Sequence, residues 1–66
     1  MNKKLKANIL LNGTTQKDLA GEMGMHPRTF YRKASHMVIN GCEMKFNEGE
    51  KEFLARRLGM KKEDIQ

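Results

Sequence analysis

The most constraining feature of the sequence is a very short connection between two predicted helices, at residues 24–27. Gly24 favours the left-handed conformation that ends a helix, and Pro27 suits the first position of the next one. Helices joined by so few residues must cross steeply, so a small side chain is needed where they meet. Ala20 is in the right place for that contact. Gly21 costs a helix about 0.5–1 kcal/mol relative to alanine, and we attribute it to close helix approach.

Helix-capping signals divide the rest of the chain. Thr15 and Asp18 have the spacing of a capping box, which predicts a helix start. The same logic predicts a helix that begins after Asn47, with Glu50 three residues on, and ends at Gly59. Apolar spacing predicts a first helix over residues 3–11 and a final short turn over residues 60–65.

Residues 37–46 separate the third helix from the last main helix. Their Asn40-Gly41 dipeptide favours a two-residue type I′ turn, and the flanking residues tolerate extended structure. The segment is therefore a surface loop or a short β-hairpin, and typical loop lengths favour the loop. The expected fold class is all-α: one compact domain over residues 1–66, with four to five helices and this loop or hairpin before the last main helix.

Charge is concentrated in one half of the chain. Residues 1–33 carry seven Lys and Arg against two Asp and Glu, whereas residues 34–66 carry six of each, so the first half holds the whole net charge of +5. A one-sided basic surface attracts polyanions, of which nucleic acid is the commonest. A purely solubilising role explains the charge equally well.

Several classes of protein are not expected. The single cysteine, Cys42, excludes an internal disulfide framework and fits a reducing cytoplasm. The apolar run at residues 9–11 is far shorter than the roughly 20 residues of a membrane span. His26 and His36 lack an evident carboxylate or serine partner, and with Cys42 they lack the paired spacing of zinc motifs. We therefore expect no enzyme activity, cofactor, metal, membrane association or small-molecule substrate.

Residues 15–33, TQKDLAGEMGMHPRTFYRK, resemble the helix-turn-helix of the lambda-repressor and Cro-like family. Four family hallmarks match in spacing, namely Gln16, Ala20, Gly24 and Phe30. The Leu-Ala-x-x-Leu-Gly segment that the family carries after the motif is present at residues 54–59. The resemblance extends over about residues 5–65, interrupted between 34 and 45. It implies a sequence-specific regulator of transcription that binds duplex DNA as a homodimer on inverted half-sites. His26 and Pro27 depart from the family, which usually has a Ser or Thr cap and then a residue, often Gln, that touches a base.

The resemblance places the third helix in the major groove. Arg28 and Arg32 are then the main base readers, because arginine grips guanine O6 and N7 together, and Thr29 and His26 are secondary ones. Five further residues are expected to contact phosphates: Thr15, Gln16, Lys17, Tyr31 and Lys33. The lysines at residues 3, 4 and 6 are either phosphate auxiliaries or a solvated end, and the second is favoured.

Two other functions remain open. The first is a protein-interaction module of the same fold, for example an antitoxin-like or antirepressor adaptor, that holds a protein through its apolar residues 37–46, although it would not explain the basic first half. RNA binding also uses basic helices, although the sequence has no aromatic stacking platform to favour it. A hairpin at residues 37–46 would serve either as a wing against the DNA backbone or as a dimer contact, and the last helix around Phe53 is the other candidate dimer surface.

Overall fold

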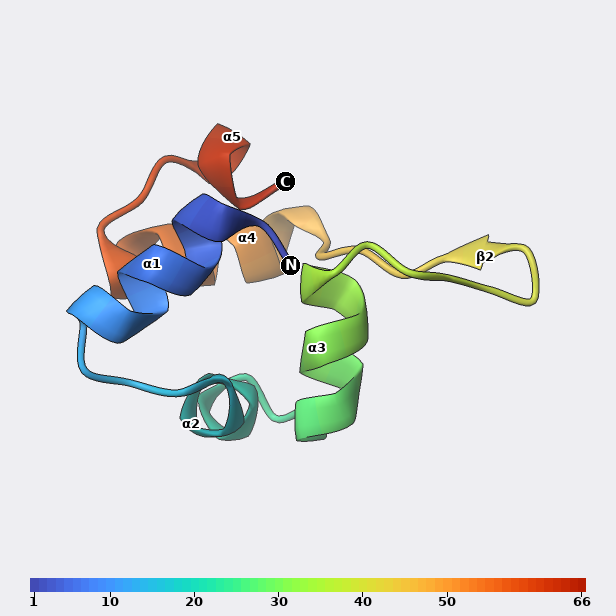
Figure 1. Cartoon of the computed structure of the whole chain (residues 1–66), viewed down its shortest axis with the longest axis horizontal. Coiled ribbons are helices and arrows are strands. Elements are labelled where there is room, and N and C mark those ends of the chain that lie inside the picture. Colours follow the sequence, from blue (N-terminus) through green and yellow to red (C-terminus); the bar gives the residue numbers. More distant parts are fainter.

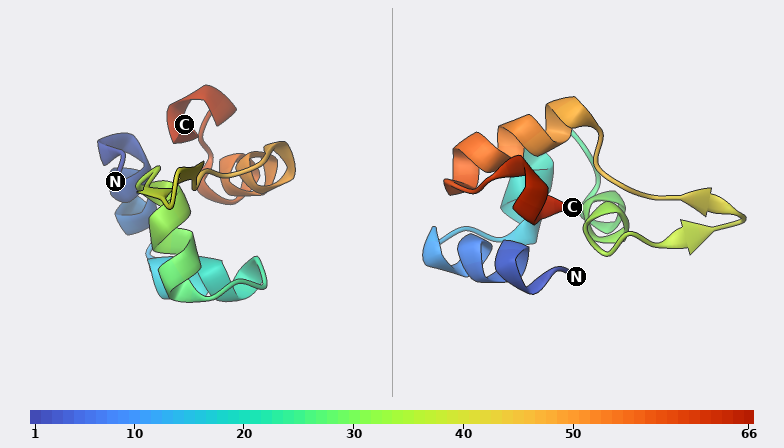
Figure 2. Two further views of the ribbon diagram at one scale, coloured as in Figure 1. Left: turned by 90° about the vertical axis from the view of Figure 1, so that its right-hand side faces the viewer. Right: turned by 90° about the horizontal axis from the view of Figure 1, so that it is seen from above.

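The computed structural model describes residues 1–66, and it contains five helices and one β-hairpin. In chain order the elements are α1 (Lys3–Leu11), α2 (Gln16–Glu22), α3 (Pro27–Ala34), β1 (Val38–Ile39), β2 (Cys42–Glu43), α4 (Glu48–Leu58) and α5 (Lys62–Ile65). The helices gather around one core, while the hairpin projects away from them (Figures 1 and 2). No helix has the length and apolar character to cross a membrane.

The predicted helix boundaries are confirmed. Thr15 caps α2, since its Oγ1 accepts a hydrogen bond from the Asp18 N–H at 3.1 Å, although the reciprocal bond of a full capping box is missing. Asn47 and Glu50 form both bonds at the start of α4, at 2.8 and 2.9 Å. Gly24 and Gly59 take left-handed conformations, with φ of 70° and 68°, where α2 and α4 end. These signals are local, so the sequence alone carries them.

The connection between α2 and α3 brings the two helices together at a steep angle. In Figure 1, α2 is seen nearly along its axis while α3 runs in the plane of the view. Ala20, the small residue predicted to lie where the two helices meet, is fully buried. The interpretation of Gly21 is wrong, because it is exposed and a Cβ added there would meet nothing within 4 Å. Its cost to α2 is therefore not offset by closer packing.

These two glycines of the α2 region should respond oppositely to alanine. Gly21→Ala should raise the free energy of unfolding by about 0.5–1 kcal/mol, since the site is helical and open. Gly24→Ala should lower it by about 1 kcal/mol, because φ is 70° there and a Cβ disfavours that conformation. Urea unfolding followed by circular dichroism measures both. Equal effects of the two substitutions would contradict this assignment.

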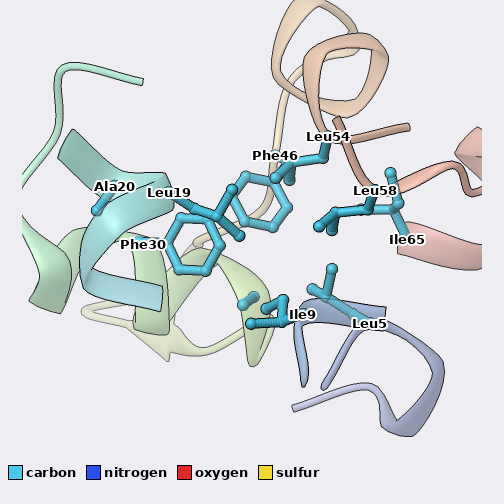
Figure 3. Close-up of a cluster of buried hydrophobic side chains, with 10 residues drawn as sticks. Leu5, Ile9, Leu19, Ala20, Phe30, Phe46, Leu54, Leu58 and Ile65 are labelled. Atoms are coloured by element: carbon cyan, nitrogen blue, oxygen red, sulfur yellow. The ribbon is translucent and has the colours of Figure 1, made fainter. Parts of the chain in front are cut away.

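The core is a single cluster of ten buried apolar side chains contributed by α1 to α5 and by the segment before α4 (Figure 3). Its two aromatic rings, Phe30 of α3 and Phe46, lie with centroids 5.3 Å apart and tilted by 57°, a favourable arrangement for an aromatic pair. The Phe46 N–H donates to the side chain of Gln66 at 2.8 Å, and the same side chain donates to the Lys33 carbonyl. Gln66 therefore links the end of α3 to the segment before α4.

Residues 37–46 form a hairpin rather than the favoured plain loop. Strands β1 and β2 are antiparallel, with Val38 opposite Glu43 and Ile39 opposite Cys42. The turn residues Asn40 and Gly41 have φ of 51° and 77°, as a type I′ turn requires. The expected helical domain is thus confirmed as a small, mostly helical domain, and the segment before the last main helix is the hairpin rather than the loop.

Candidate nucleic-acid interface

Helix α3 is amphipathic, with its core face and its charged face on opposite sides. Phe30 and Ala34 are buried in the core cluster. Arg28 and Arg32 lie four residues apart on the side opposite Phe30, so both guanidinium groups can point to the same external partner. Arg28 is exposed and Arg32 is half-buried, and neither is within ion-pair distance of a carboxylate. These two cations are therefore available for an anionic ligand.

His26 caps α3, at the position where the family that the sequence resembles usually has Ser or Thr. Its Nδ1 accepts a hydrogen bond from the Arg28 N–H at 3.0 Å, directly before Pro27. Accepting this bond requires Nδ1 to be unprotonated, which leaves the Nε2–H as the group that can donate to an external acceptor. His26 is exposed, so the same side chain fixes the start of α3 and presents a donor beside Arg28.

Two further predicted residues of α3 also lie at its surface. Tyr31 is half exposed and Thr29 is partly exposed, on either side of the ridge that Arg28 and Arg32 form. Lys33 does not join them. Its ammonium group contacts both carboxylate oxygens of Glu50, at 2.9 and 3.1 Å, and only 22 % of its side chain is exposed. Lys33 therefore ties α3 to α4, and we remove it from the phosphate-contacting set.

The start of α2 presents a second group of donors. Thr15 and Lys17 are exposed and Gln16 is partly exposed. The N–H groups of Gln16 and Lys17 have no acceptor within the chain, and the Lys17 ammonium group has no acidic partner. Asp18 also lies in this first turn and remains a negative charge at the site.

One of the three lysines for which the sequence favoured a solvated end joins this group in the structure. Lys6 of α1 lines a shallow pocket together with Thr15 and Gln16, so α1 brings its charge to the start of α2. Lys4 instead pairs with Asp64 at 3.1 Å. No sequence signal separates these two lysines, because their difference depends on how α1 packs against α2 and α5.

Ion pairs compensate most of the positive charge in residues 34–66 but little of it in residues 1–33. Four of the six Lys and Arg of residues 34–66 pair with a carboxylate, but only two of the seven in residues 1–33 do so. Arg57 of α4 also binds Glu22 at 3.0 Å, which neutralises one of the two acidic residues of the first half. The uncompensated positive charge therefore belongs to the surface that includes the start of α2 and the outer face of α3.

The carboxylate whose pKa is most clearly shifted by neighbouring charges lies outside this surface. Glu48, at the start of α4, contacts Lys62 at 3.2 Å and Lys51 at 3.5 Å. The hydrogen bond from Lys62 and the positive charges of both lysines hold the pKa of Glu48 below its usual range. Glu48 consequently favours its ionised form and compensates the charges of Lys51 and Lys62.

The structure thus brings eight of the nine predicted DNA-contacting residues to the surfaces of α2 and α3 and adds Lys6. It offers donors and cations, but no enclosed site. No protein-family model, curated protein or solved structure matches this chain, so its function is argued from these residues alone.

Proposed function

We propose that this protein is a helix-turn-helix regulator of transcription that binds duplex DNA, with α3 in the major groove. The fold that we assign to it is lambda-repressor-like, with α2 and α3 as the two helices of the motif. In this role it binds as a pair on inverted half-sites and blocks access to the promoter. The proposal assigns it no catalytic activity, cofactor or small-molecule substrate.

The observation that carries this proposal is the pair of uncompensated arginines opposite the core face of α3. An α-helix fits the major groove, and arginine recognises guanine there through two parallel hydrogen bonds. Arg28 and Arg32 are one helical turn apart, so they can reach neighbouring base pairs along the groove. Thr29 can contact a thymine methyl group, and His26 can donate to a base or phosphate from Nε2.

The start of α2 supplies the contacts that fix the helix in the groove. Thr15, Gln16 and Lys17 present unpaired N–H groups, a hydroxyl and an ammonium group beside α3, and Lys6 adds a further charge. Such groups bind phosphate oxygens without regard to sequence, and they set the orientation of the reading helix. Tyr31 offers its hydroxyl to a phosphate at the edge of the same face.

The dependence of binding on salt tests this proposal. If Lys6 and Lys17 each neutralise about one phosphate, a plot of log affinity against log salt should have a slope near −1.8, that is about −0.9 for each of two contacts. Fluorescence anisotropy of a labelled 20-base-pair duplex between about 50 and 200 mM salt measures it. The Lys17→Ala variant should reduce the slope by about one, whereas Lys61→Ala should leave it unchanged. A slope near zero for the unsubstituted protein would contradict the proposal.

A further inference from the structure

The outer face of α3 carries hydrogen-bond donors and no amide or carboxylate side chain. Arg28 and Arg32 can only donate, and no carboxylate of the chain pairs with either. His26 accepts the Arg28 N–H at its Nδ1, at 3.0 Å, so its imidazole offers an external partner only the Nε2–H donor. The other long donor of the helix, Lys33, is held by Glu50 at 2.9 Å. The sequence of α3, PRTFYRKA, contains no Asn, Gln, Asp or Glu.

This set of side chains limits which base α3 can recognise through two hydrogen bonds at once. Guanine presents two acceptors in the major groove, N7 and O6, which match the paired donors of a guanidinium group. Adenine presents an acceptor beside a donor and requires an amide, whereas cytosine presents a donor and requires a carboxylate. The one amide of residues 15–34, Gln16, lies at the start of α2 beside Lys6 and Thr15, among the expected phosphate contacts. Guanine is therefore the base that fits α3.

The spacing of the two arginines determines the spacing of the guanines. Residues four apart share one side of a helix and lie about 6 Å apart along its axis. Since base pairs follow one another about every 3.4 Å, a helix that lies along the groove sets two such side chains about two base-pair steps apart. Between Arg28 and Arg32, Phe30 is buried in the core, and Thr29 and Tyr31 each offer a single hydroxyl. The base pair between the two guanines is thus read by no pair of hydrogen bonds.

We propose that each DNA half-site contains two G·C pairs separated by one base pair of any sequence, with Arg28 reading one guanine and Arg32 the other. This inference rests on the proposed function and adds the class of DNA sequence that the protein prefers. Both side chains extend from an ordered backbone. His26 fixes the first turn of α3 by holding the N–H of Arg28 itself, and Arg32 lies one turn further on in the same helix.

Exchange of each arginine for glutamine tests the assignment position by position. Duplexes selected from a random-sequence pool by the 66-residue protein should share two G·C pairs with one variable pair between them. Because glutamine recognises adenine through two hydrogen bonds, Arg28→Gln should change the preference at one position from G·C to A·T, and Arg32→Gln should change it at the other. Each variant should bind its newly selected duplex about tenfold more tightly than the original one. Arg56→Gln, which alters an exposed arginine of α4, should leave both preferences unchanged.

A modified base provides a second measurement with the unsubstituted protein. 7-Deazaguanine lacks the N7 acceptor but still pairs with cytosine. At either of the two proposed guanines it should weaken binding by about tenfold, because one of the two hydrogen bonds to a charged donor is lost. The same base placed in the intervening pair should change the affinity by less than about twofold, since α3 makes no pair of hydrogen bonds there.

The outcomes separate this inference from the proposed function. Selected duplexes that lack two G·C pairs at this spacing would overturn the inference, and so would unchanged preferences in both glutamine variants. The proposed function survives either result if Arg28→Gln and Arg32→Gln still bind duplex DNA more weakly than the unsubstituted protein. Both fail if no sequence is enriched from the pool and the two variants bind DNA as well as the unsubstituted protein. Circular dichroism verifies that the variants stay folded, as expected for side chains opposite the core face.

Discussion

Replacing Arg28 and Arg32 together by alanine is expected to weaken binding to a preferred duplex by about a hundredfold or more. Each bidentate contact to guanine contributes about 1–3 kcal/mol of discrimination, and both guanidinium groups lack a partner within the chain that would retain them. The duplex is selected from a random-sequence pool with the unsubstituted protein, and affinities are compared by anisotropy at one salt concentration.

The matched control for this variant removes two charges elsewhere. Arg56 lies on α4, is exposed and pairs with Glu52, and Lys61 follows α4. Replacing both by alanine changes the net charge equally, but it should reduce affinity by less than about threefold, because distant exposed charges are screened by salt. Equal losses in the two double variants would mean that the basic residues attract DNA only through total charge, and they would contradict base reading by α3.

Replacing Phe46 by alanine is expected to abolish stable folding. Large-to-small substitutions of buried aromatic residues cost about 3–5 kcal/mol. A domain of 66 residues has a total stability of roughly 3–10 kcal/mol, at about 0.05–0.15 kcal/mol per residue. Phe46 is fully buried against Phe30, so its removal also takes away the packing that holds α3 in place.

Thermal unfolding followed by circular dichroism and the dispersion of amide signals measure this loss. Phe53 provides the control, because it is only half-buried at the edge of the same cluster, so Phe53→Ala should leave a cooperative transition at a lower Tm. A fall in Tm of less than about 5 °C for Phe46→Ala would contradict the role of Phe46 in the core, because that corresponds to only about 1 kcal/mol in a domain of this size.

Helix boundaries could be predicted from the sequence because the interactions that set them are local. The Thr15 and Asn47 caps act on residues three positions away, and Gly24 and Gly59 satisfy a backbone requirement at their own positions. The Asn40-Gly41 turn was visible for the same reason. That residues 37–46 form a hairpin rather than a loop could not be predicted, because typical loop lengths favour a loop and the turn dipeptide alone does not outweigh them.

Features that depend on distant parts of the chain could not be predicted. Lys33 was assigned to DNA because its charge is visible in the sequence, whereas its pairing with Glu50 depends on how α3 packs against α4. The position of Lys6 beside α2 depends likewise on the packing of α1. Gly21 was misinterpreted because sequence spacing did not reveal that its surroundings are open. These are the positions where tertiary packing, rather than local propensity, decides the role of a residue.

The most direct test of DNA binding through α2 and α3 is a titration of isotope-labelled protein with a short duplex, followed by backbone amide shifts at low and then at higher salt. The account predicts that the largest shifts lie at residues 15–17 and 26–32 and that they fade steeply as salt is raised. Amides of α4 and α5, where four cations are already paired, should move little. Shifts confined to the hairpin or to α4, or no shifts at all, would contradict it.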